Sequence, residues 1–375
     1  MNTAKLGDLV KIQTGKLDAN ASVSDGDYPF FTCSKAALRI DNYSYECECV
    51  LVAGNGDLNV KYYDGKFDAY QRTYIIESDD KNILDVKYLY YFMETYIHKL
   101  REQSIGGVIK YIKLGNLTDA KIPLPDLKTQ KKIVAVLDKA QMLIVKRKAA
   151  ISRLDELLQS VFLDMFGDPV SNERKWEKEL FGTCLLKIES GWSPRCETFP
   201  ASKGEWGVLK LSAVTKGVYI PGENKELLKD LEPKQDIVVN KGDLLFIRKN
   251  TLDLVGTSAF VFDTPDFLMM PDTIFRFVLA DDRRLNKLFL WQLFNNIRFK
   301  KEVQKLAGGS AGSMPNISKQ KLKNIGLIIP DISLQNQYAN FVMKQEKQKE
   351  IMKKSLRELE ENFQSLLYRG FKGKL

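Results

Sequence analysis

Histidine is almost missing from this sequence, which contains only His98 among 375 residues. One histidine cannot build a histidine-based metal site alone, and histidine-dependent acid–base catalysis would rest on that residue. The five cysteines form no Cys-x-x-Cys pair, so we expect reduced thiols rather than a disulfide framework. These shortages weigh against a metalloenzyme and against a disulfide-stabilised domain, and we expect neither metal nor cofactor.

Long apolar runs are missing too. No run approaches the ~18 residues that a membrane helix needs, and the first residues, Met1 to Asp8, include no apolar signal segment. The hydrophobic content of 44% and the charged content of 28% are those of an ordinary globular chain. We therefore predict a cytoplasmic protein without a membrane partner.

Catalytic signatures are also missing. The sequence contains no phosphate-binding Gly-x-x-x-x-Gly-Lys-Ser/Thr loop, no Gly-x-Ser-x-Gly and no Asn-Pro-Pro-Tyr/Phe of the amino-methyltransferases. The acidic pairs Asp79-Asp80 and Asp281-Asp282 precede helix-like stretches, where turn residues are expected. We therefore predict that the chain is not an enzyme by itself.

Positive charge is present, but only in the second half. Residues 1–168 carry 23 basic and 23 acidic residues, whereas residues 169–375 carry 34 basic and 25 acidic residues. The entire net charge of +9 thus lies in the second half. Such a basic half favours an anionic partner, nucleic acid first.

The sequence repeats itself once. Residues 112–168 align with residues 317–373 at a constant offset of 205 without a gap. Identical pairs include Gln130 with Gln335, and the motif Glu-x-x-Gln-Ser recurs at 156–160 and 361–365. Two long units are too few for a solenoid or a propeller, so the architecture is predicted to occur twice.

Each repeat has the same order of elements. A region of short β-like runs comes first, and a helix-like stretch follows at residues 87–103 and at 286–306. A glycine-rich turn at 104–107 or 307–313 then leads to an apolar run that ends at a proline. One long helix completes the repeat, with Thr129 as the expected N-cap of the first.

Apolar residues recur along the first long helix at alternating spacings of four and three, which is a heptad pattern. The helix could pack on its own domain or pair with its counterpart, and the shared period favours antiparallel pairing. The residues predicted to pair the helices are Ile133, Leu137, Ile144, Ile151, Leu154, Leu158, Met352, Leu356, Leu359, Phe363 and Leu366.

Polar and aromatic loops supply the candidate DNA contacts. Asn and Gln amides suit adenine edges, Arg suits guanine, and lysines or main-chain N–H groups suit phosphates. An ordinary solvated loop is the competing interpretation of each. The candidates are Lys35, Arg39, Asn55, Asn59, Lys61, Tyr70, Gln71, Arg72, Lys110, Lys113, Lys210, Lys216, Arg248, Lys249, Asn250, Thr251, Arg276, Ser310, Ser313 and Asn316.

Taken together, these features resemble the specificity subunits of type I restriction–modification systems. The resemblance is carried by Lys5-Leu-Gly-Asp-Leu, by Ile122-Pro-Leu-Pro-Asp-Leu-x-x-Gln130, by Ser160-Val-Phe-Leu-Asp-Met-Phe-Gly-Asp168 and by the degraded copy Ile328-Ile-Pro-Asp-Ile-Ser-Leu-Gln335. It covers essentially the whole chain. The sequence departs from the family in lacking a Glu before the glutamine, where Thr129 and Leu334 stand.

The resemblance implies an α+β fold with two α/β target recognition domains, each followed by a long helix, and the helices paired antiparallel about a pseudo-twofold axis. The implied divisions are a first recognition domain at 1–125, a central helix at 126–168, a second recognition domain at 169–330 and a distal helix at 331–375. Each domain would read one half of a split, asymmetric site in double-stranded DNA. The helices would set the spacing and dock two modification (methyltransferase) subunits, which restriction subunits with translocase activity then join.

Other interpretations remain open at this point. One is the specificity subunit of another bipartite system, in which the partner fuses methylation and cleavage. Another is a coiled-coil scaffold whose globular units bind proteins, which would give no sequence-selective DNA footprint even with methyltransferase partners present. An enzyme would have to show turnover by the purified chain alone.

Overall fold

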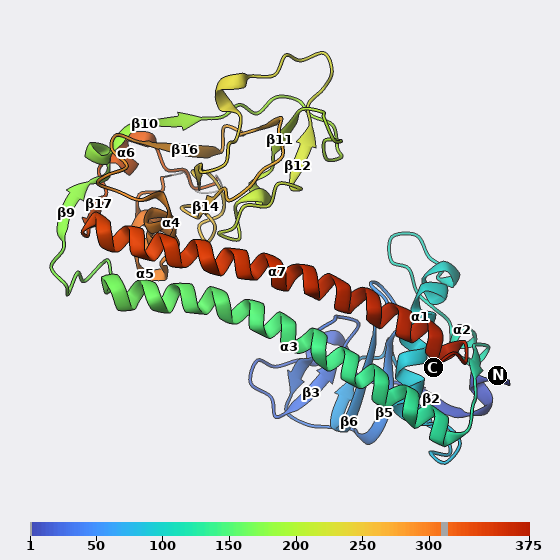
Figure 1. The fold of residues 1–375 in the computed structure, drawn as a ribbon. Coiled ribbons are helices and arrows are strands. Elements are labelled where there is room, and N and C mark those ends of the chain that lie inside the picture. The colour runs from blue at the N-terminus through green and yellow to red at the C-terminus, as the bar shows by residue number, and fades with distance from the viewer. Residues whose placement is uncertain (1, 309–313) are drawn as a thin grey trace. The chain divides into compact units, whose positions relative to one another are not determined.

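The computed structural model describes residues 2–308 and 314–375, and the chain divides into two compact units. Unit 1 comprises Met1–Ala149 and Met352–Leu375, and unit 2 comprises Ala150–Ile351. Each unit therefore contains one half of both long helices, α3 (Leu127–Phe166) and α7 (Ile332–Phe371) (Figure 1). The predicted α+β class, with a long helix after each domain, is confirmed.

Unit 1 is built on a six-stranded sheet in the order β2-β7-β5-β6-β3-β4. Neighbouring strands run antiparallel, except that β3 and β6 are parallel. The strands are β2 (Val10–Thr14), β3 (Tyr28–Phe31), β4 (Leu38–Ile40), β5 (Tyr45–Ala53), β6 (Val60–Ala69) and β7 (Thr73–Ser78). A smaller pair joins β1 (Thr3–Lys5) to β8 (Lys121–Pro123).

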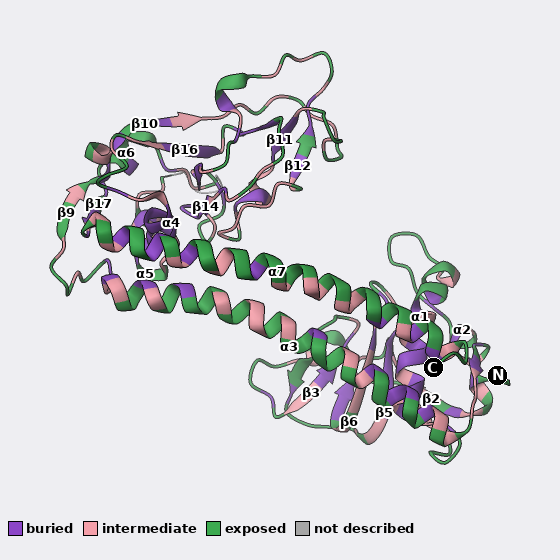
Figure 2. Cartoon of the chain, in the orientation of Figure 1, coloured by how far each residue is buried: buried purple, intermediate pink, exposed green. Residues whose placement is uncertain are grey.

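The core of unit 1 explains why β5 is central. Every residue from Cys49 to Ala53 is buried, as expected of a continuous apolar run covered on both faces (Figure 2). Val50 and Val52 share a core with helix α1 (Val86–Gln103), while Cys49 and Leu51 belong to a second core on the opposite face. The alternation is the two-residue period of a strand. Unit 1 also contains α2 (Leu114–Thr118) and the short 3-10 helices η1 (Leu6–Asp8) and η2 (Ala19–Ala21).

Unit 2 repeats this plan with shorter strands. Its main sheet has the order β10-β16-β13-β14, and a three-stranded sheet has the order β12-β11-β15. The strands are β9 (Glu177–Leu180), β10 (Leu185–Ser190), β11 (Gly207–Leu209), β12 (Asn224–Glu226), β13 (Leu244–Ile247), β14 (Ser258–Phe260), β15 (Leu268–Met269), β16 (Ile274–Leu279) and β17 (Gly326–Ile329). The 3-10 helices are η3 (Phe181–Cys184), η4 (Leu211–Ala213) and η5 (Gln235–Ile237).

The helical stretch that the sequence predicts at 286–306 is two helices, α4 (Lys287–Asn295) and α5 (Ile297–Lys305). Asn296 between them is extended, and its side-chain oxygen accepts hydrogen bonds from the N–H groups of Arg298 and Phe299 at 3.0 and 3.1 Å. This N-cap starts a new helix inside the predicted one, so a single helix was the wrong prediction. Helix α6 (Lys319–Lys323) follows.

The first long helix also starts earlier than predicted. It begins at Leu127, and the Asp126 carboxylate accepts hydrogen bonds from the N–H of Thr129 at 2.8 Å and from its hydroxyl at 3.0 Å. Asp126 therefore satisfies the free N–H groups of the first turn, which is the role of an N-cap. The sequence-based choice of Thr129 was wrong by one turn.

The repeat extends to individual hydrogen bonds. Gln130 is fully buried; its oxygen accepts from the N–H of Asp85 at 2.9 Å, and its amide donates to the carbonyls of Ile83 and Pro125 at 2.8 and 2.9 Å. The equivalent Gln335, also fully buried, joins the start of α7 to the start of α4 in the same way. Each glutamine thus fixes the start of α1 or α4 to the start of the long helix of the same repeat.

Within each unit the halves of the long helices run antiparallel. In unit 1, the ammonium of Lys148 lies 2.8 Å from the carboxylate of Glu360, and Gly370 lies against Ile133. In unit 2, the hydroxyl of Tyr338 donates to the carbonyl of Leu158 at 3.2 Å. Higher residue numbers on one helix thus meet lower numbers on the other.

All eleven residues predicted to pair the helices are buried or partly buried, and their pairing across the two helices stays a prediction. They are Ile133, Leu137, Ile144, Leu158, Phe363, Ile151, Leu154, Met352, Leu356, Leu359 and Leu366. The first half of α3 shares its core with α1 as well as with α7. Both options left open by the sequence therefore occur, because each helix packs on its domain and on the other helix.

One seam position in unit 2 holds a buried lysine. Lys349 occupies the place of Ile144 in the repeat, is 5% exposed, and pairs with the carboxylates of Asp155 and Glu346. Burial alone would lower the pKa of Lys349, but its hydrogen bond to Asp155 and the charge of Glu346 raise it overall. The stabilisation by these charges is therefore present below the ordinary lysine pKa and is lost only when the pH rises above the raised value.

Replacing Asp155 by alanine is expected to lower the unfolding free energy of unit 2 by about 1–2 kcal/mol, because it leaves the Lys349 ammonium poorly paired. The value is modest because half of the Asp155 side chain is exposed. Adding Lys349→Met should restore stability. In the exposed pair Lys148–Glu360, Glu360→Ala should cost under about 0.5 kcal/mol. Chemical unfolding that ranks the two alanine variants equally would contradict this.

Candidate nucleic-acid interface

In unit 1, loops that are far apart in the sequence meet where β5 ends and β7 begins. The N–H of Gly54 donates to the carbonyl of Arg72 at 2.7 Å, and the carbonyl of Gly54 accepts from Ile112 at 2.9 Å. The N–H of Gly56 donates to the carbonyl of Lys110 at 2.9 Å. We call this surface cluster 1 and define it as residues 33–35, 54–59, 70–72 and 104–111.

Cluster 1 brings together several of the predicted DNA contacts. Lys35, Gln71, Arg72 and Lys110 are exposed, and Asn55 and Tyr70 are half-buried. The Gln71 amide donates to the carboxylate of Asp18 at 3.2 Å. This surface therefore presents cations and amides, the groups that contact phosphates and base edges.

Two predicted contacts lie underneath the loops instead. The Asn59 amide donates to the carbonyl of Cys33 at 2.8 Å, and the Lys61 ammonium donates to the side chain of Asn59 and to the carbonyl of Thr32. Burial lowers the pKa of Lys61, with the nearby Cys33 acting in the opposite direction. These side chains hold the loops in place.

The glycine-rich turn of cluster 1 is shaped by backbone needs. Gly106 has a φ of +118°, and a Cβ there would lie 2.5 Å from the carbonyl oxygen of Ile109. Only glycine accepts this conformation and this close approach. The turn leaves Val108 fully exposed at the tip, between the bases of the loop at Ile105 and Tyr111, which are joined by backbone hydrogen bonds of 3.0 and 2.8 Å.

Two further predicted contacts of unit 1 lie outside cluster 1. Arg39 is on β4, where its guanidinium donates to the carbonyl of Asp27 at 3.3 Å. Lys113 precedes α2, and its N–H donates to the side chain of Asn116 at 2.7 Å. Both lysine and arginine remain exposed, and their contact with DNA stays a prediction.

Unit 2 builds an equivalent surface. The N–H of Arg248 donates to the carbonyl of Thr273 at 3.1 Å, and the carbonyl of Arg248 accepts from Ile317 at 2.8 Å, as Gly54 does with Arg72 and Ile112. Gly308 and Asn316 exchange two backbone hydrogen bonds of 2.9 Å at the base of the second glycine-rich turn. We define cluster 2 as residues 248–251, 271–273, 308 and 314–316.

The side chains of cluster 2 differ from those of cluster 1. Lys249 and Thr251 are exposed, whereas Asn250 is buried. The Arg248 guanidinium lies 5.2 Å from the centre of the Phe275 ring and donates to the side chain of Asn316 at 3.2 Å. The predicted contacts Ser310 and Ser313 lie outside the described residues.

Arg276 was wrongly predicted as a DNA contact. It is 8% exposed, and its guanidinium donates to the carboxylates of Glu189 and Asp243 at 2.6 and 2.9 Å and to the carbonyls of Asp236 and Val238 at 2.8 and 2.6 Å. Burial opposes its charge, but the carboxylates raise the pKa overall. The side chain therefore joins β10 and β16 to the loop before β13 and does not face solvent.

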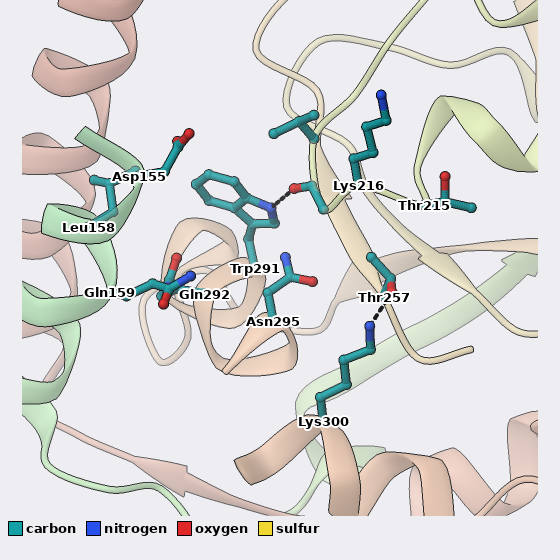
Figure 3. A pocket seen from close by; sticks show the side chains of 12 residues that line it. Asp155, Leu158, Gln159, Thr215, Lys216, Thr257, Trp291, Gln292, Asn295 and Lys300 are labelled. Atoms are coloured by element: carbon teal, nitrogen blue, oxygen red, sulfur yellow. Dashed lines mark hydrogen bonds between the residues drawn. The ribbon is translucent and has the colours of Figure 1, made fainter. Parts of the chain in front are cut away.

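The remaining predicted contacts, Lys210 and Lys216, belong to another part of unit 2. The Lys210 ammonium lies 3.7 Å from the carboxylate of Glu223. Lys216 is exposed at the mouth of a groove of about 340 Å³ beside α3 (Figure 3). Across the groove the Trp291 indole donates to the carbonyl of Gly217 at 2.8 Å, and the Lys300 ammonium donates to the hydroxyl of Thr257 at 2.7 Å.

Apart from Lys216, the sequence did not identify the residues of this groove as functional. Trp291 stands in an apolar helical stretch that is typical of a core, whereas Lys300 stands in a charged one. Nothing in the sequence marks their shared opening. The available signal was Gln159, which lines the groove from α3 and is identical to Gln364 in the repeat although both are exposed. Retention at an exposed position has no explanation in helix packing.

Two kinds of feature are absent from the described residues, a metal-ligand group and a membrane-length apolar helix. Over residues 2–308 and 314–375, no three His, Cys, Asp or Glu side chains group closely enough to hold a metal ion. Over the same residues no helix has both the length and the apolar character to cross a bilayer.

Comparison with known proteins identifies a family model and several relatives that match this chain. The family model of the type I restriction modification DNA specificity domain matches residues 1–153 and 202–361. The chain is 40% identical over 157 residues to the type I restriction enzyme EcoDI specificity subunit of Escherichia coli, a match that covers 42% of this chain and 35% of that protein. It is 31% identical over 175 residues to the EcoEI specificity subunit of Escherichia coli, covering 44% of this chain and 29% of that protein. These matches span about a third of each relative.

A third relative matches over almost the full length. The MjaVIII specificity subunit of Methanocaldococcus jannaschii is 22% identical over 403 aligned residues, covering 99% of this chain and 92% of that protein. Among solved structures, the type I restriction–modification S subunit from M. genitalium superposes with a TM-score of 0.59 at 15% identity, covering 99% of this chain and 96% of that one. A chain from a structure on assembly and conformational transition of the type I R-M system has a TM-score of 0.56 at 15% identity, covering 100% and 98%.

Proposed function

Because the chain belongs to the type I restriction modification DNA specificity domain family, we propose that it selects the DNA sequence on which a restriction–modification complex acts. Each unit reads one half of a bipartite, asymmetric site in double-stranded DNA. The observation that carries this proposal is the pair of loop clusters, which share their backbone hydrogen bonds but not their side chains. Two clusters with the same backbone hydrogen bonds but different side chains suit the recognition of two different half-sites.

The long helices act as the spacer in this proposal. A helix of 40 residues measures about 60 Å. That length is enough to separate two recognition domains by one or more DNA turns, at about 34 Å for each turn. The predicted divisions at 1–125, 126–168, 169–330 and 331–375, with their pseudo-twofold relation, are retained as part of this proposal.

The proposed protein partners rest on the same family membership. Two modification (methyltransferase) subunits dock on the helices, and restriction subunits with translocase activity join them. The methyl donor and the bond-making groups then reside in those partners, in a cytoplasmic complex, and this chain needs no cofactor of its own. The first recognition domain carries 15 basic and 17 acidic residues and the second carries 25 and 19, so the free chain should bind DNA weakly.

The test is a single substitution in one cluster. In the complex with modification subunits, Arg72→Ala should weaken binding by about 10-fold or more, roughly 1–3 kcal/mol, through loss of discrimination at one half-site only. Lys249→Ala in cluster 2 is the matched variant and should affect only the other half. The measurement is competition binding with duplexes that carry changes in one half at a time, after methylome sequencing of the host with and without the gene has given the target. A wild-type complex without any sequence-selective binding would favour a protein-binding scaffold instead.

A further inference from the structure

The groove beside α3 in unit 2 is not an isolated feature. In unit 1 a groove of about 430 Å³ occupies the equivalent place. Gln364 lines it where Gln159 lines the groove of unit 2, and Tyr90 and Glu94 stand for Trp291 and Asn295. Both grooves thus lie between a long helix and a shorter helix, α1 in unit 1 and α4 in unit 2. The loop 215–218 forms a further wall in unit 2, and residues 58–60 do so in unit 1.

The two grooves differ in how their cations are neutralised. In unit 1 the ammonium of Lys35 and the guanidinium of Arg101 lie 3.3 and 3.7 Å from the same carboxylate, that of Asp57. The Arg101 guanidinium also donates to the carbonyl of Leu58 at 2.9 Å. The positive charge of this groove is therefore largely satisfied within unit 1.

In unit 2 the positive charge has no such partner. Neither Lys216 nor Lys300 forms an ion pair with any of the described residues. Lys300 is half-buried, and among the described residues its ammonium donates to the neutral hydroxyl of Thr257. Burial lowers the pKa of Lys300, while Asp253 acts in the opposite direction. The one acidic residue of the lining, Asp155, is already paired with Lys349.

The position of this groove is close to cluster 2 along the chain. Thr257 ends the loop that begins in cluster 2, and the N–H of Ile247 donates to its carbonyl at 2.9 Å. The lining also includes the polar side chains of Thr215 and Asn295, and of Gln159 on α3 at the other side of Trp291 (Figure 3). Lysines and hydroxyls beside a base-reading loop are the groups that hold phosphate oxygens.

We propose that the groove of unit 2 binds the DNA backbone next to the half-site that cluster 2 reads, with Lys300, oriented by Thr257, and the exposed Lys216 each contacting a separate phosphate. This inference rests on the proposed function and adds a contact that carries no sequence information. The groove of unit 1, whose two cations share Asp57 and whose lining includes Glu94, contributes much less.

The test measures how DNA affinity depends on salt, because each phosphate contact releases counterions. In the complex with modification subunits, the double variant Lys216→Met/Lys300→Met should lose about 10-fold in affinity at low salt. The slope of log K against log salt should become shallower by about 1 to 2, since one phosphate contributes about 0.9. Discrimination between target and non-target sequences should not change, because the lost contact is to the backbone.

The control variants separate this contact from general charge. Lys305→Met removes a lysine from the same helix whose ammonium pairs with Glu302 at 2.7 Å, and it should leave the slope unchanged. Lys300→Arg keeps the charge and should retain most of the slope. Lys216 is exposed, so Lys216→Met alone tests the proposal even if changes at the half-buried Lys300 disturb folding.

Each alternative has its own result. A wild-type complex that binds its target selectively, together with an unchanged slope in the lysine variants, overturns this inference and leaves the proposed function standing. Loss of complex assembly in the lysine variants, with the weak DNA binding of the free chain unchanged, would assign the groove to a partner subunit and overturn the inference. Protection of Lys216 and Lys300 from amine acetylation by inorganic phosphate, as strongly as by target DNA at equal ionic strength, would make it a site for a free anion.

Discussion

Gly191→Ala is expected to unfold unit 2 under conditions in which the unchanged protein is folded. A Cβ at residue 191 would lie 2.0 Å from the carbonyl oxygen of Met270, which is main chain and cannot move aside as a side chain would. The cost should be about 4 kcal/mol or more, at the upper end of overpacking effects. Thermal unfolding of the variant, followed by circular dichroism, measures it.

The repeat supplies a second site and a control for this prediction. Gly15 has the same contact in unit 1, with the Ala69 carbonyl oxygen 2.0 Å from a built Cβ, so Gly15→Ala should destabilise unit 1 comparably. Gly222 has no atom within 4 Å of its built Cβ and should tolerate alanine with a change under about 0.5 kcal/mol. Equal stability of the Gly191 and Gly222 variants would contradict the close approach. Each of the two crowded glycines lies against a residue of a loop cluster, Gly15 against Tyr70 of cluster 1 and Gly191 against Pro271 of cluster 2.

Gln335→Leu is expected to have the next largest effect. The substitution leaves the N–H of Asn286 and the carbonyls of Arg284 and Pro330 without the partner that they have at 2.9, 3.2 and 2.7 Å. Buried groups left unpaired cost about 1–3 kcal/mol each, and partial access of water to the two at the helix start reduces the sum to about 3 kcal/mol. Chemical unfolding measures the loss.

Gln335→Glu separates the hydrogen bonds from packing. The glutamate keeps the shape and the acceptor but loses the donors, and its charge would be buried. The variant should therefore be destabilised at neutral pH, and its stability should rise as the pH falls and the carboxylate becomes protonated. Gln364→Leu on the same helix, at an exposed position, is the matched control and should be nearly neutral for stability. A stability of Gln335→Leu equal to that of Gln364→Leu would show that the buried glutamine does not fix α4 to α7.

Local patterns were enough to predict the elements whose cause is local. The run at Cys49–Ala53 is apolar at every position, and it forms the central strand β5 buried on both faces. The heptad spacing predicted α3 to within a few residues, because apolar residues must recur at that period for a seam to close. The break at Asn296 escaped prediction, since an N-cap inside an otherwise helical stretch depends on how the next turn packs.

Long-range partnerships could not be predicted in the same way. Arg276 looked like an arginine in a polar loop, because Glu189 and Asp243, which neutralise it, are 87 and 33 residues away in the sequence. Which loops meet in cluster 1 likewise follows from the sheet order, which the sequence does not display. The repeat was the useful exception: positions retained in both copies, such as Gln130 and Gln335, marked contacts that the fold makes twice.

The division of the long helices between the units has a consequence for biosynthesis. Unit 2 is one uninterrupted stretch, Ala150–Ile351, whereas unit 1 needs Met352–Leu375 to supply Phe363 and Leu367 to its core. On the ribosome, residues 1–149 therefore cannot complete the fold of unit 1 until residues 352–375 have been made, whereas unit 2 can finish folding earlier. In nascent chains stalled before residue 352, we expect unit 2 to resist proteolysis and residues 1–149 of unit 1 to be sensitive to it.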